Sequence, residues 1–112
     1  MKNAIASVEI FAHEPDEGVR RLTLVIDQPR RRDGTNGADG WVCRVALADE
    51  HRPLEITATD SVAVLVAALD QADRWLGELE NRGIRLTRDR AGAISYSLAP
   101  ELLADRYSPA AV

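Results

Sequence analysis

Residues 60–83 read DSVAVLVAALDQADRWLGELENRG, and this stretch decides the fold. Its apolar side chains recur at spacings of three and four, which is typical of an amphipathic helix. Asp60 is a common N-cap residue, and Gly83 can adopt the left-handed conformation that ends a helix. The sequence therefore predicts a helix over about residues 60–82. The face that we expect to be buried carries Val62, Leu65, Val66, Leu69, Ala72, Leu76 and Leu79, widened by Val64, Ala68 and Trp75.

Four segments before this helix alternate between apolar and polar residues, which is the pattern of strands with one buried face. These segments cover residues 4–12, 19–27, 41–48 and 54–58. The alternation favours a half-solvated antiparallel sheet over a parallel sheet that is covered on both faces. We therefore predict an α+β fold, in which an antiparallel four-stranded meander is packed by one long amphipathic helix. A short hairpin and a short C-terminal helix follow it.

The hairpin is predicted from apolar alternation at residues 84–87 and 93–98, and the last helix from a proline in the first turn of residues 100–107. Residues 108–112 are predicted to be a frayed tail. Residues 28–40 contain proline, glycine and three consecutive arginines without an apolar period, so we expect a long flexible hairpin loop. The chain of 112 residues has the size of one domain, and we expect residues 1–112 to form a single domain.

The composition is that of an ordinary globular protein, with 46% hydrophobic and 29% charged residues. The longest apolar run, at residues 62–69, is too short to cross a bilayer. The N-terminus has no signal-peptide pattern, and the single cysteine, Cys43, fits a reducing compartment. We therefore expect a cytoplasmic protein that does not contact a membrane.

A meander sorts its turns to two ends of the sheet, and one of these ends is predicted to be acidic. It gathers His13, Glu14, Asp16, Glu17, Asp49, Glu50 and His51, together with the C-terminal end of the long helix. Carboxylates and imidazoles are metal ligands, but two of these turns lie about 10 Å apart by strand spacing, and no compact ligand motif joins them. We therefore predict solvated turn residues and no metal site.

The other end carries Arg30, Arg31 and Arg32, which are the predicted partner-binding residues. Guanidinium groups engage carboxylates or phosphates, although a short charge run in a loop can simply keep the loop solvated. The formal net charge of −4 argues against nucleic acid as the partner, so weak nucleic-acid binding through these arginines is a lesser alternative.

The sequence contains no catalytic or cofactor signature that we recognise. Cys43 and Ser61 lack the local motifs of a nucleophile, and the glycines of residues 28–40 join two strands instead of a strand and a phosphate-binding helix. We therefore predict no catalytic residue and no cofactor, and leave open whether the protein is an enzyme.

Two short patterns resemble an uncharacterised family of small bacterial proteins. These patterns are Trp41-Val42-Cys43 in a strand and Asp60-Ser61-Val62-Ala63-Val64-Leu65 at the start of the helix. The likeness covers about residues 25–86. It departs at Val64, where the family usually has alanine, and after Leu86, where a tryptophan is common. The resemblance implies the fold and carries over no functional residue, and some relatives resemble toxin-immunity proteins.

The leading functional hypothesis is a noncatalytic protein-binding module, either immunity-like or adaptor-like. The alternative is a small enzyme or small-molecule-binding protein with a pocket between the sheet and the helix. We also predict a homodimer, because the first strand of a meander leaves an unpaired edge and residues 4–11 carry no proline to protect it.

Overall fold

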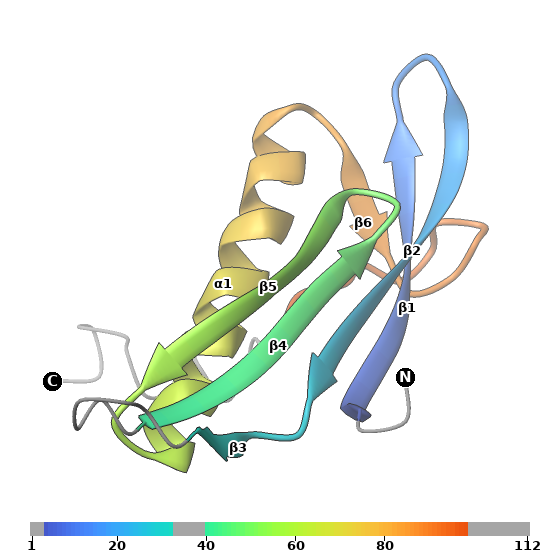
Figure 1. Cartoon of the computed structure of the whole chain (residues 1–112). Coiled ribbons are helices and arrows are strands. Elements are labelled where there is room, and N and C mark those ends of the chain that lie inside the picture. The colour runs from blue at the N-terminus through green and yellow to red at the C-terminus, as the bar shows by residue number, and fades with distance from the viewer. Residues whose placement is uncertain (1–3, 33–39, 99–112) are drawn as a thin grey trace, which may run out of the picture.

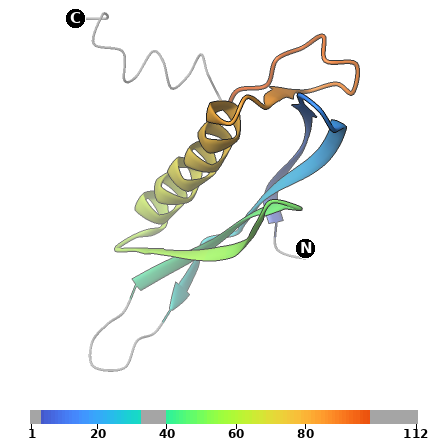
Figure 2. The ribbon, with the colours of Figure 1, turned by 90° about the horizontal axis from the view of Figure 1, so that it is seen from above.

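The computed structural model describes residues 4–32 and 40–98 (Figure 1). Its elements in chain order are β1 (Ala4–Glu14), β2 (Gly18–Asp27), β3 (Arg30–Arg32), β4 (Gly40–Ala48), β5 (His51–Ala58), α1 (Ser61–Asn81) and β6 (Arg85–Thr87). The strands form one six-stranded antiparallel sheet, and α1 lies on one face of it (Figure 2). The predicted α+β class, with an antiparallel sheet and one long helix, is confirmed.

The sheet contains the predicted meander but is larger than four strands. β1 pairs with β2, β2 with β4, and β4 with β5. β3 pairs with the first part of β4, and β6 pairs with the end of β1. The prediction of four strands is therefore wrong. The sheet also contains β3, which was predicted as loop, and β6, which lies in the hairpin predicted at residues 84–87 and pairs with β1.

Strand β3 lies within the stretch that was predicted to be a loop. β2 reaches β4 only through residues 45–48, so the beginning of β4 needs another partner on that side. Pro29 has no N–H to donate and separates β2 from β3, after which Arg30–Arg32 pairs with residues 40–42. The predicted loop is therefore wrong for residues 30–32, and residues 33–39 lie outside the described part.

The chain after α1 forms a narrow hairpin that joins the main sheet. β6 pairs with β1, and an isolated bridge joins Thr87 to Ser95. The carboxylate of Asp89 closes the turn by accepting hydrogen bonds from the backbone N–H groups of Ala93 and Ile94, at 2.9 and 2.8 Å. The C-terminal helix predicted at residues 100–107 and the frayed tail at 108–112 lie outside the described residues.

Both ends of α1 have the predicted caps. Asp60 accepts a 2.7 Å hydrogen bond from the N–H of Ala63. Gly83 has φ +85°, and the N–H of Ile84 bonds to the carbonyl of Leu79, which is a Schellman termination. Within the described ranges, no helix is long and apolar enough to cross a membrane.

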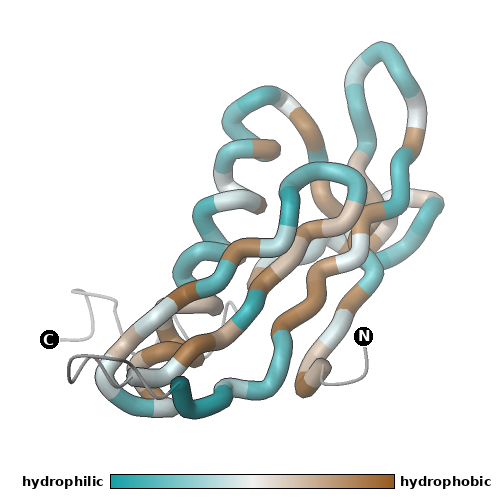
Figure 3. The backbone as a smooth tube through the Cα atoms, in the orientation of Figure 1, coloured by the Kyte–Doolittle hydropathy of each residue, from teal (hydrophilic) through white to brown (hydrophobic). Residues whose placement is uncertain are grey.

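The core lies between the sheet and α1, and apolar and polar residues alternate along the strands (Figure 3). Its fully buried members include Ile10, Ala12, Leu22, Cys43, Val45, Leu47, Val64, Ala68, Ala72 and Leu79. The helix is rotated from the predicted face, since Val62 and Val66 are 70% and 52% exposed. The helix carries two overlapping apolar stripes, one with Val62 and Val66 and one with Val64, Ala68 and Ala72. The stripe with Val64 faces the sheet, because the small side chains of Ala68 and Ala72 allow a close approach.

This rotation is tested by two valines on the same helix. Val64→Ala removes a fully buried side chain and should lower the free energy of unfolding by about 1.5–3 kcal/mol. Val62→Ala changes an exposed side chain and should alter it by less than about 0.5 kcal/mol. Urea denaturation measures both changes in the free energy of unfolding. Equal losses in the two variants would show that the assignment of Val64 to the buried face of α1 is wrong.

Candidate functional site

The three arginines predicted to bind a partner are divided between the two faces of the sheet. Register places Arg30 opposite Val42, Arg31 opposite Trp41 and Arg32 opposite Gly40. Because side chains alternate along a strand, Arg30 and Arg32 lie on the face away from α1, whereas Arg31 lies on the side of Trp41, which packs against the core. The structure therefore brings two of the three together.

Arg30 and Arg32 meet the carboxylate of Glu55 in β5. The Nη2 atom of Arg30 donates to Glu55 Oε2 at 3.1 Å, and the Nη2 atom of Arg32 donates to Glu55 Oε1 at 2.7 Å. A third guanidinium, from Arg44 in β4, lies 3.9 Å from Glu55 Oε2. We call the group of Arg30, Arg32 and Arg44 around Glu55 the arginine platform.

The platform has more positive than negative charge. A hydrogen bond from Arg32 and the charge of Arg32 lower the pKa of Glu55 below its ordinary 4.5, and the charges of Arg30 and Arg44 act in the same direction against burial. Glu55 is therefore ionised at neutral pH, and three guanidinium groups share one carboxylate. Their side chains are 62%, 47% and 47% exposed, so they remain accessible to a partner.

Two hollows adjoin the arginines of the platform. One, of about 300 Å³, is lined by Asp27, Gln28, Arg30 and Arg44. The other, of about 330 Å³, is lined by Arg32, Gly40, Trp41, Val42, Thr57, Ala58 and Thr59. Arg30 and Arg44 therefore line one hollow and Arg32 lines the other, so guanidinium groups of the platform are accessible from both.

Sequence reasoning missed Arg44 and Glu55 as members of this site. Both lie on the polar side of their strands, and they are direct cross-strand partners. A signal for the pair was present, because opposite charges often face each other across antiparallel strands. The register that brings them to Arg30 and Arg32 depends on β3, which the sequence does not predict.

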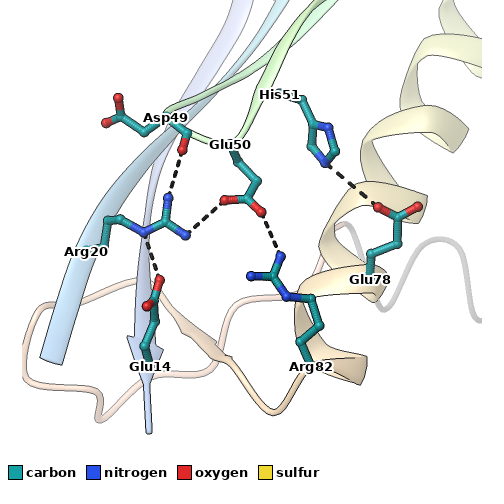
Figure 4. Close-up of polar contacts among 7 residues, drawn as sticks. All are labelled: Glu14, Arg20, Asp49, Glu50, His51, Glu78 and Arg82. Atoms are coloured by element: carbon teal, nitrogen blue, oxygen red, sulfur yellow. Dashed lines mark hydrogen bonds and ion pairs between the residues drawn. The ribbon is translucent and has the colours of Figure 1, made fainter. Parts of the chain in front are cut away.

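The end of the sheet that was predicted to be acidic carries a balanced ion-pair network (Figure 4). Arg20 donates to Glu14 at 2.8 Å, to Glu50 at 2.9 Å and to the carbonyl of Asp49 at 2.8 Å. Arg82, at the end of α1, donates to the other oxygen of Glu50 at 2.9 Å. Two arginines therefore neutralise two carboxylates, and the network ties both turns to the helix.

The two histidines predicted at this end also have structural partners. His51 stacks on Trp75 of α1 with ring centroids 4.7 Å apart, and its Nε2 lies 3.8 Å from Glu78. His13 Nε2 lies 2.8 Å from the hydroxyl of Thr87, which itself donates to the carbonyl of Asp89. A hydroxyl has one proton, so His13 Nε2 must be the donor to Thr87. Among the residues at 4–32 and 40–98, no His, Cys, Asp or Glu group is arranged to hold a metal ion.

Two nucleophilic side chains, Cys43 and Thr87, are not arranged for catalysis. Cys43 is 1% exposed, its thiol lies 3.2 Å from the carbonyl of Asp27, and burial raises its pKa. Thr87 is fully buried, and its hydroxyl proton is already donated. Both groups are therefore parts of the packed interior.

An apolar groove of about 220 Å³ opens between the sheet and α1. It is lined by Ala6, Ser7, Val8, Leu24, Ile26, Leu69, Tyr96 and Leu98. This groove occupies the place where the alternative hypothesis puts a small-molecule pocket. It contains no charged side chain, so it offers an apolar ligand little to orient it.

Comparison of the chain with protein-family models, with curated proteins and with solved structures found no match. The resemblance of residues 41–43 and 60–65 to a bacterial family therefore stays a prediction.

The ion-pair network predicts a pH-dependent stability. Burial raises the pKa of Glu50, but the hydrogen bonds and charges of Arg20 and Arg82 outweigh it and bring the pKa below 4.5. A lowered pKa in the folded state gives stability that is present above the unfolded value and lost as pH falls through the folded one. Glu50→Gln should therefore cost about 1–2 kcal/mol at pH 7, and the cost should shrink below about pH 4.5.

Denaturation of both proteins between pH 7 and pH 3 measures this difference. Glu78→Gln is the matched control, because the Glu78 side chain is 63% exposed and its contact with His51 is long. A difference between wild type and Glu50→Gln that stays constant over the whole pH range would contradict the assigned role of the carboxylate.

Proposed function

We propose that this protein is a noncatalytic binding module whose arginine platform holds an acidic segment of a protein partner. The observation that carries the proposal is the sharing of one carboxylate, Glu55, by the guanidinium groups of Arg30, Arg32 and Arg44. Planar guanidinium groups form paired, charge-assisted hydrogen bonds with carboxylates, so the unshared donors of the arginine platform favour an acidic ligand.

The rest of the chain supports a protein partner over nucleic acid. The chain has a net charge of −4, which repels an extended polyanion, whereas a short acidic segment meets only the local positive field. The platform is compact and adjoins two hollows, and a phosphate backbone calls for a longer basic stripe. An adaptor or an immunity-type inhibitor works through such an interface, and we propose that it acts in the cytoplasm, where the buried thiol of Cys43 stays reduced.

A small-molecule function is the weaker candidate. The apolar groove of about 220 Å³ is smaller than the roughly 300–1,000 Å³ of most ligand pockets and lacks converging polar groups. A thermal-shift screen against metabolites tests it, since a ligand that binds the folded state raises the melting temperature.

The platform is tested by affinity capture from a lysate of the source organism. The double variant Arg30→Ala/Arg32→Ala should weaken binding of the captured protein by about tenfold for each hydrogen-bonding arginine that it removes. Arg74→Ala is the matched control, because Arg74 is an exposed arginine on α1 whose ion partner is Asp70. Equal binding by all three proteins would contradict the proposal.

A second variant separates binding from structure. Glu55→Gln removes the internal carboxylate and frees the guanidinium groups, so it should strengthen binding of the same partner by severalfold. If the arginines only stabilise the sheet, Glu55→Gln and the double arginine variant should weaken binding together. Retention of single-stranded DNA or RNA, lost in the double variant and in high salt, would instead identify a nucleic-acid surface.

A further inference from the structure

The outer edge of β1 is paired over only part of its length. β6 pairs with residues 11–13, and no other described strand reaches this edge. The remaining stretch, residues 4–10, has exposed side chains at Ala4, Ile5, Ala6, Ser7 and Glu9. A row of unpaired backbone groups on such a strand is a template for another strand.

The hydrogen bonds of β6 show which residues present these groups. The backbone carbonyl of Leu86 accepts a hydrogen bond from the N–H of Tyr96, so the backbone hydrogen-bonding groups of Leu86 point away from β1. In an antiparallel ladder the neighbouring residues point the other way, which makes Phe11 and His13 the residues bonded to β6. The same alternation along β1 turns the N–H and C=O groups of Ser7 and Glu9 to the open edge.

The two edges of the sheet differ in their protection. The opposite edge, β5, contains Pro53 and the charged residues Arg52 and Glu55, which are features that block strand addition. Residues 4–10 contain no proline, and their one charged side chain, Glu9, is 3.6 Å from Arg21 on β2. The open edge therefore carries no proline and no uncompensated charge, and its one irregularity is the bulge between Ala4 and Ala6.

The flank of this edge is apolar. Ala6, Ser7 and Val8 form one wall of the apolar groove, and Ile5 is 50% exposed. This edge of β1 therefore suits a strand that has no uncompensated charge and is flanked by apolar residues. Residues 4–10 of a second copy have both of these properties.

We propose that a second copy of the chain pairs with this edge, antiparallel and about a two-fold axis at Ser7. Ser7 is the midpoint of the free stretch 4–10, so this register centres the new ladder beside the bulge between Ala4 and Ala6 and leaves β6 of each copy outside it. It places Ser7 opposite Ser7 and Ala6 opposite Val8, and it keeps the two Glu9 side chains apart, so like charges do not face each other. The axis is perpendicular to the sheet, so the apolar grooves of the two copies lie on the same face of the combined sheet.

Proline substitution at Ser7 tests the pairing. Ser7→Pro removes an N–H that points to the open edge, and it leaves every hydrogen bond between β1 and β2 in place. The subunit should therefore fold and the dimer should be lost. Ser7→Ala keeps the N–H and should keep the dimer. Light scattering at high micromolar concentration measures the masses, and circular dichroism checks the fold. A monomeric wild type, or a dimer that survives in folded Ser7→Pro, overturns the proposal.

Cross-linking tests the register independently of proline. Ser7→Cys places two thiols side by side, on Cα atoms about 5.5 Å apart, and a short bismaleimide should join them. Thr23→Cys is the control on the same face, because β2 strands of the two copies lie about 14 Å apart or more. Cys43 is buried and should not react. Cross-linking that is equal at both positions overturns the register. The double arginine variant should still dimerise, which separates this proposal from the proposed function.

Discussion

The structure depends on β4, whose backbone needs partners on both sides along nine residues. β5 supplies one side, whereas on the other side β2 pairs with residues 45–48 and β3 with residues 40–42. On the helix side, Cys43, Val45 and Leu47 are at most 1% exposed beneath α1. The need to satisfy the backbone of this buried strand draws the arginines of β3 into the sheet beside Arg44 and Glu55.

The features that local sequence determines were predictable. The alternation of the four longer strands, the Asp60 cap and the Gly83 termination follow from residue type and period, and the structure contains all of them. β3 was not predictable, and β6 was predicted only as part of a separate hairpin, because each joins the sheet where a distant strand offers unpaired groups. The rotation of α1 was not predictable from period either, since Val62 and Val64 belong to stripes of similar hydropathy and the fit of Ala68 and Ala72 to the sheet decides between them.

The candidate site shows the same division. Arg30, Arg31 and Arg32 are visible in the sequence, but the identity of the face on which each lies requires the register of β3. Glu50 was assigned to an acidic end, yet Arg20 and Arg82 lie 30 and 32 residues from it and neutralise the Glu14 and Glu50 carboxylates only in the folded chain. Contacts between charges that are distant in sequence therefore determine that the network around Glu50 is balanced and that the arginine platform has surplus positive charge.

The two charge clusters differ in a way that bears on their roles. The network around Glu50 joins two arginines to two carboxylates, and the Glu50 side chain is only 13% exposed, so its hydrogen bonds hold the turns to the helix. The arginine platform has surplus guanidinium groups on an exposed face. A two-fold axis perpendicular to the sheet would keep the platforms of both copies on one face, at least about 24 Å apart, because five strand spacings separate the two β4 strands. A partner with two acidic segments at that separation would bind both platforms, and the second contact would be intramolecular, so a weak contact at each platform can give firm binding overall.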